Sequence, residues 1–128
     1  MNTDESLTLL ARGKEAWNAW AAEMLAEKAR LEAAGEWGED KAKAWRAAAR
    51  ADFDGHTFEV DVSFEDFVFP GDASFVGANF LRVAAFIAMR VHGDAAFPHA
   101  KFADLVTFLN VRFGSGSWFR AVHFEGVA

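Results

Sequence analysis

The sequence contains no cysteine and no tyrosine, only two prolines, and no apolar run of membrane-spanning length. The missing cysteines exclude a disulfide framework, a thiolate metal site and a cysteine nucleophile. The N-terminal segment is acidic and then amphipathic, unlike the basic and then apolar layout of a signal peptide. We therefore expect a cytoplasmic protein without membrane contact. The alanine-rich composition without tyrosine points to a bacterial source.

Motifs that carry chemistry are also missing from the sequence. It has no phosphate-binding loop, no dinucleotide fingerprint and no nucleophile elbow. His92, His99 and His123 lack metal-ligand spacing. The stretch 52–55 resembles the start of a calcium loop, but the remaining ligands are absent. We expect a protein that is not an enzyme and that holds no metal and no cofactor.

Phenylalanine is abundant, with 14 residues in 128. From residue 51 onward an apolar residue recurs in steps that alternate between five and six, which fits neither a helix nor a simple strand. One of these positions is Val91. The others are Phe53, Phe58, Phe64, Phe69, Phe75, Phe80, Phe86, Phe97, Phe102, Phe108, Phe113, Phe119 and Phe124.

Two steps of five and two of six give a period of 22 residues, and GDASFVGANF (71–80) aligns with GDAAFPHAKF (93–102). A period in this range is typical of a solenoid. The residue two before each phenylalanine is mostly small or apolar, so that both point inward from an extended segment. We predict a β-solenoid whose coils have four short sides, with one phenylalanine from each side in the centre. Phenylalanines one coil apart then stack in columns.

Proline and glycine mark the predicted corners of each coil. Pro70 and Gly71 stand where a type II turn requires them. Gly55, Gly77, Gly93 and Gly126 each follow a core position by two residues, where a positive φ is easiest for glycine. The sixth residue of alternate units is expected to widen its corner.

The first fifty residues favour helices. Residues 6–34 contain no proline, and Trp17, Trp20, Met24 and Leu31 fall at helical spacing. Residues 39–50 begin with acids and end with arginine, as the helix dipole favours. We predict two parts, a helical cap over 1–50 and a repeat domain over 51–128, because the end of a solenoid has to be covered.

Units such as ADF, ASF, ANF and AKF resemble the pentapeptide-repeat proteins, whose consensus is A-(D/N)-(L/F)-x-x. GKEAWNAW (13–20) is similar to the helical segment that often precedes such repeats. The resemblance implies a right-handed, four-sided parallel β-helix, here of about three and a half coils.

Charge is unevenly distributed along the repeat. Residues 51–72 carry seven acids and no base, whereas residues 73–128 carry three acids and five bases. Arg90 and Arg112, one coil apart, form a short ladder. The resemblance implies one alternative function, a DNA mimic that binds DNA gyrase and protects it from fluoroquinolones. A mimic needs phosphate-like charge along its whole length, but here the excess of acids over bases ends with the first coil. Direct nucleic-acid binding is not expected.

We favour a non-enzymatic protein-interaction or assembly module, and two surfaces carry this hypothesis. The first is an outward apolar patch for an unidentified protein partner, made of Leu81, Val83, Ile87, Leu105 and Leu109. Whether the N-terminal helices fold back over this patch stays open.

The second surface is the C-terminal end, where Trp118, Val122 and Phe124 belong to a last half-coil without a cap. An uncovered strand edge promotes pairing, so we expect a homodimer through this end. A head-to-tail filament is a further alternative.

Overall fold

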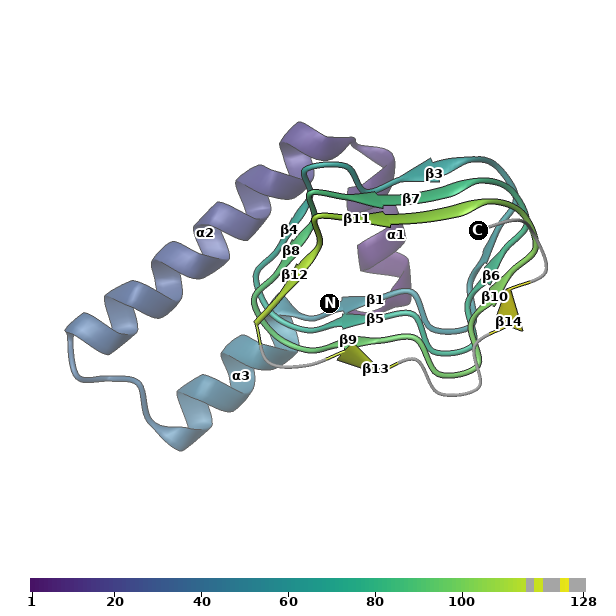
Figure 1. The fold of residues 1–128 in the computed structure, drawn as a ribbon. Helices are drawn as coiled ribbons and strands as arrows, with labels where there is room; N and C mark the ends of the chain where they lie inside the picture. The colour runs from purple at the N-terminus through teal and green to yellow at the C-terminus, as the bar shows by residue number, and fades with distance from the viewer. Residues whose placement is uncertain (115–116, 119–122, 125–128) are drawn as a thin grey trace.

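The computed structural model describes residues 1–114, 117–118 and 123–124, with the side chains described up to Gly114. Three helices come first: α1 (Thr3–Ala11), α2 (Lys14–Ala33) and α3 (Glu39–Ala49). Short strands follow in a stack of coils (Figure 1). They are β1 (Ala51–Asp52), β2 (Thr57–Phe58), β3 (Val62–Ser63), β4 (Val68–Phe69), β5 (Ala73–Ser74), β6 (Asn79–Phe80), β7 (Ala84–Ile87), β8 (Arg90–Val91), β9 (Ala95–Ala96), β10 (Lys101–Phe102), β11 (Val106–Leu109), β12 (Arg112–Phe113), β13 (Ser117–Trp118) and β14 (His123–Phe124).

The strands form four parallel sheets, in the orders β1-β5-β9-β13, β2-β6-β10-β14, β3-β7-β11 and β4-β8-β12. Paired residues are 22 positions apart, as in Ala51 with Ala73 and Phe58 with Phe80. This arrangement is compatible with the predicted four-sided parallel β-helix. We call residues 51–72 the first coil, 73–94 the second, and the chain from residue 95 the third.

Stacked phenylalanine rings fill the interior. The rings of Phe75 and Phe97 lie 4.9 Å apart and within 4° of parallel, and those of Phe58 and Phe80 lie 4.7 Å apart. These separations match the ~4.8 Å between neighbouring strands of a sheet. Identical residues in register therefore place ring over ring, and the column becomes continuous. Buried small residues such as Ala73 and Ala95 leave room beside the rings.

The alternating steps of five and six produce two kinds of corner. At each five-residue corner that the structure describes, the residue two after the phenylalanine has a positive φ, as in Gly55 (68°) and Gly77 (67°). At four of these corners, those after Phe53, Phe64, Phe75 and Phe97, the phenylalanine carbonyl accepts a hydrogen bond from the amide three residues on, as from Ala100 to Phe97 at 3.0 Å. These are type II turns. The positive-φ residues at five-residue corners are Gly55, Asp66, Gly77, Ala88, His99 and Asn110.

The predicted type II turn at Pro70 and Gly71 is wrong, because this is a six-residue corner and Gly71 does not have a positive φ. The same correction applies to Gly93, while Gly126 lies outside the described residues. In a six-residue corner the extra residue redirects the chain, so no left-handed residue is needed. Gly93 is instead favoured by the close approach of the preceding coil, because a Cβ on residue 93 would clash with Oδ1 of Asp72.

Aspartates satisfy the backbone at the six-residue corners. Asp61 Oδ1 accepts a hydrogen bond from the Val83 amide at 3.2 Å, and Asp72 Oδ1 accepts one from the Asp94 amide at 2.9 Å. Each acid belongs to the first coil and bonds to the second. Part of the acidity of the first coil is therefore structural.

The helical part differs from the expected single helix over 6–34. The chain breaks at Gly13, whose φ of 98° a residue with a side chain rarely adopts. The break lets α1 lie across the N-terminal opening of the stack of coils (Figure 1). α2 projects away from the coils, and α3 runs back beside α2. Leu7 and Leu10 of α1 pack against the core. Among the described residues, no helix is both long and apolar enough to cross a membrane.

Side chains from the helices take the place of a preceding coil. Asn18 of α2 accepts a hydrogen bond from the Val68 amide at 2.9 Å and donates one to the Asp66 carbonyl at 3.0 Å. Ser6 of α1 accepts from the Asp52 amide at 2.9 Å. These bonds satisfy the otherwise open edges of β4 and β1, which would promote pairing with another chain.

Trp17 closes the N-terminal end of the core. Its side chain is fully buried, and its ring lies 5.9 Å from that of Phe53 and 5.2 Å from that of Phe69. Its indole nitrogen donates to the Val68 carbonyl at 3.0 Å. Phe67, the one phenylalanine outside the five-and-six series, is buried beside it, with the rings 5.8 Å apart. The cap therefore extends the aromatic core beyond the first coil.

We predict that Ala88→Gly stabilises the protein by about 0.5–1 kcal/mol. Ala88 has a φ of 51°. This left-handed conformation costs a non-glycine residue roughly 1–2 kcal/mol, and glycine avoids that cost. The greater flexibility of glycine in the unfolded chain cancels part of the gain. Ala85→Gly, in the strand before it, should destabilise the protein instead. Chemical denaturation measures the free energy of unfolding of both variants. A loss of stability in Ala88→Gly would contradict the positive φ of residue 88.

We predict that Asn18→Ala lowers the free energy of unfolding by about 1–2 kcal/mol, because it leaves two backbone groups at a partly open edge without their protein partner. Glu23→Ala, an exposed change on the same helix, is the control and should have little effect. Urea denaturation measures both. Equal stability of the two variants would show that Asn18 does not act as a substitute strand.

Candidate interaction surface

The outer face of the β3–β7–β11 sheet changes from acidic to apolar along the stack. Glu65, Ile87 and Leu109 occupy equivalent positions in successive coils, and Ile87 pairs with Leu109. Leu109 is 52% exposed and Ile87 is half-buried. The first coil therefore presents a charge where the second and third coils present branched apolar side chains.

The same change occurs at the corner that leads into this sheet. Position 59 is glutamate and position 61 is aspartate, whereas one coil on these places hold Leu81 and Val83. Leu81 and Leu105 are 47% and 40% exposed, and Val83 is half-buried. The five residues predicted from the sequence thus wrap around one corner of the second and third coils. We call Leu81, Val83, Ile87, Leu105 and Leu109 the apolar patch.

The N-terminal helices leave the apolar patch open. The contacts of α1 are with β1 and those of α2 are with β4, on other sides of the coil. The apolar residues of the helices instead pack against the end of the phenylalanine columns and the first coil. Of the two arrangements considered, the structure has the one in which Leu81, Leu105 and Leu109 contact solvent.

The far end of the β3–β7–β11 sheet adjoins the patch. In the part of the chain that the structure describes, β11 is the outermost strand of this sheet. Phe108, whose ring stacks on that of Phe86 at 4.7 Å, is still 37% exposed. Leu109 follows it directly. This end therefore combines a strand edge with aromatic and aliphatic surface.

The remaining predicted interface residues cannot be placed in full. The backbone of Trp118 pairs with Ala96, and that of Phe124 pairs with Phe102. Their side chains, together with Val122 and Phe119, lie outside the described residues. Their role at an interface stays a prediction.

Most acids of the first coil have partners within the protein. Arg50 contacts Asp52 at 3.0 Å and Asp54 at 3.2 Å. Asp54 also accepts a hydrogen bond from the Val76 amide at 3.0 Å. Asp66 lies 4.0 Å from Lys14. With the two corner aspartates, five of the seven acids have a partner within the protein, although Asp61, Asp66 and Asp72 are exposed, as Glu59 and Glu65 are.

Metal-ligating side chains are scattered through the region described. No three histidine, aspartate or glutamate side chains there lie close enough to hold a metal ion. His56 is half-buried and lies edge-on to Phe58, with the rings 4.6 Å apart. Its position is that of a packing residue near the end of the core.

Sequence reasoning missed the capping roles of Ser6 and Asn18. The signal was weak, because each is a single polar residue in a helical segment and its partner lies about fifty positions away. In comparisons with known proteins, no family model, curated protein or solved structure gave a significant match. The interpretation of the surfaces therefore depends on the repeat and on the geometry.

We predict that Leu81→Asp and Leu109→Asp leave the protein folded, with the free energy of unfolding changed by less than about 1 kcal/mol, because surface substitutions disturb little packing. Phe86→Asp should prevent folding, since Phe86 is fully buried. Circular dichroism and thermal melting check all three. Unfolding of the leucine variants would mean that the patch is covered within the monomer.

Proposed function

We propose that this protein is a non-enzymatic interaction or assembly module that forms a homodimer through its C-terminal end. The observation that carries the proposal is the joint exposure of Phe108 and Leu109 on the outermost described strand of a parallel sheet. The apolar patch continues from this end along the side of the coils and provides a surface for a further protein partner.

Two physical effects favour association at this end. Among the described residues β11 is the last strand of its sheet, and the edge of such a strand promotes pairing with another chain. Covering an exposed leucine or phenylalanine adds roughly 1.5–3 kcal/mol per fully buried side chain. A two-fold axis brings the same edge and the same side chains together from both copies, which closes the assembly at two subunits.

The proposal includes a finer description of the fold. We assign the chain to the pentapeptide-repeat proteins on its A-x-F units, and propose a right-handed winding of about three and a half coils. The 22-residue register and the aligned phenylalanine rings support this assignment. We also propose that it acts in the bacterial cytoplasm.

DNA-gyrase binding is the alternative function, and the surface charges favour it less. A DNA mimic displays its acids to the partner along its whole length. Here the acids concentrate in the first coil, and Asp52, Asp54 and Asp61 are engaged with Arg50 or the backbone. In the later coils one corner carries exposed Leu81 and Leu105, and another face carries Arg90 and Arg112.

A head-to-tail filament is the second alternative. It requires the C-terminal end of one copy to stack on the N-terminal end of the next. α1 lies across that N-terminal end, and Trp17 and Asn18 already occupy its core and edge positions. The filament therefore demands displacement of the cap, whereas a two-fold dimer does not.

We predict a dimer at micromolar concentration that Leu109→Asp or Trp118→Glu converts to a folded monomer, since each places a charge at the proposed interface. Val60→Asp is the matched control, because Val60 is 72% exposed but belongs to the first coil. Sedimentation velocity over a concentration series measures the oligomeric state.

A monomer at every concentration would contradict the dimer, and open-ended growth would favour the filament. Loss of association in Val60→Asp to the same degree would place the interface elsewhere. Dose-dependent inhibition in a supercoiling assay with purified DNA gyrase would favour the alternative function.

A further inference from the structure

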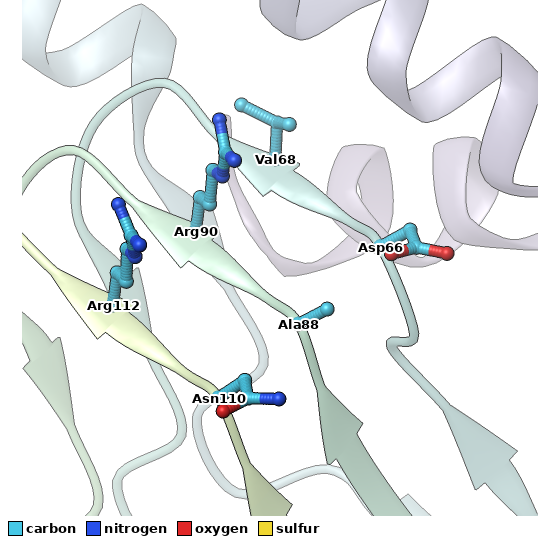
Figure 2. A pocket seen from close by; sticks show the side chains of 6 residues that line it. All are labelled: Asp66, Val68, Ala88, Arg90, Asn110 and Arg112. Atoms are coloured by element: carbon cyan, nitrogen blue, oxygen red, sulfur yellow. The ribbon is translucent and has the colours of Figure 1, made fainter.

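A second surface lies on the outer face of the β4–β8–β12 sheet, around the corner from Ile87 and Leu109 of the apolar patch. It is a hollow of about 420 Å³ lined by Asp66, Val68, Ala88, Arg90, Asn110 and Arg112 (Figure 2). Arg90 and Arg112 are register partners on adjacent strands, and Figure 2 shows both side chains rising to the same side of the sheet. Strands in a sheet are ~4.8 Å apart, so the two arginine side chains begin from neighbouring backbone positions.

The pair has no internal counter-ion in the region described. Both side chains are exposed, and neither forms an ion pair with a described residue. The one acid in the hollow, Asp66, faces Lys14 at 4.0 Å. Like charges directly opposite each other on neighbouring strands destabilise a sheet. The arginine pair therefore carries a modest repulsion that a bound anion would relieve.

The equivalent position in the first coil is Val68, which pairs with Arg90. Val68 is half-buried beside α2, whereas Arg90 and Arg112 are exposed beyond the cap. Only the second and third coils therefore present arginine to solvent on this sheet. A second hollow of about 230 Å³ borders the pair on its other side, where His92 and Gly114 contribute to its wall. The two guanidinium groups are thus approachable from both sides.

We propose that Arg90 and Arg112 form a binding site for a phosphate monoester or inorganic phosphate. Such a group carries roughly −1.5 to −2 charges at neutral pH and three acceptor oxygens. It matches the two positive charges and accepts hydrogen bonds from both guanidinium forks at once. A carboxylate has one charge and two oxygens, which a single arginine satisfies. Charge matching therefore selects phosphate.

The phosphate has two possible sources with the same chemistry, a free phosphate compound or a phosphorylated side chain of a protein partner. The hollow borders the apolar patch, because Ala88 and Asn110 in its wall directly follow Ile87 and Leu109. Binding here and association through the C-terminal end are separable in experiment.

The test is a titration of the full-length protein with inorganic phosphate, read by the NMR signals of the arginine side-chain Nε–H groups. Sodium chloride at matched ionic strength controls for screening. We expect saturable shifts for Arg90 and Arg112 and none for Arg82, an exposed arginine on another side of the second coil. Arg90→Gln and Arg112→Gln should each weaken binding roughly tenfold, because each removes a charge-assisted pair of bonds. Arg82→Gln should not.

Equal shifts at Arg82, or no loss of binding in the two glutamine variants, would overturn the site. Peptides with phosphoserine, serine or glutamate at one position then distinguish the sources. Tighter binding of the phosphoserine peptide than of inorganic phosphate indicates a phosphorylated partner, and equal binding indicates free phosphate. Glutamate binding as tightly as phosphoserine would overturn the selection of phosphate. Retained phosphate binding in Leu109→Asp would show that the site is independent of the dimer.

Discussion

The stacking of phenylalanine on phenylalanine at the spacing of a parallel sheet is the constraint on which the rest of the structure depends. Rings such as Phe80 and Phe102 lie 4.7 Å apart and within 6° of parallel, which matches the ~4.8 Å step between strands. Backbone pairing and ring stacking therefore require the same register. A shift by one residue would break both at every coil, so a repeat of very short strands still specifies one arrangement.

The corners and the cap are consequences of this register. Because every coil has to return after 22 residues, a side with five residues turns through a left-handed residue such as Gly77, and a side with six turns without one. Aspartates then bond across corners to the next coil. At the start there is no preceding coil, so Trp17 supplies the missing aromatic surface and Asn18 supplies the missing backbone partners.

The outward-facing residues do not take part in ring stacking, and their chemical character differs from one side of the coil to another. One corner and its adjoining sheet carry Leu81 and Leu109, another sheet carries Arg90 and Arg112, and the acids of the first coil mostly serve the fold. In a solenoid each outward position repeats once a coil, so a charge or an apolar side chain that recurs becomes a stripe. The proposed interface and the proposed phosphate site are both such stripes.

The sequence by itself determined the period, the inward residues and the helical character of the first fifty residues. Those features follow from a strict local pattern, since steps that alternate between five and six match neither the 3.6-residue period of a helix nor the 2-residue period of a single strand. It also indicated the apolar patch and the arginine ladder, because residues 22 apart must lie side by side. The tertiary structure alone decided that the helix breaks at Gly13, that the cap leaves Leu109 open, and that Ser6 and Asn18 complete strand edges. These depend on contacts between residues about fifty positions apart, for which no repeat in the sequence provides a guide.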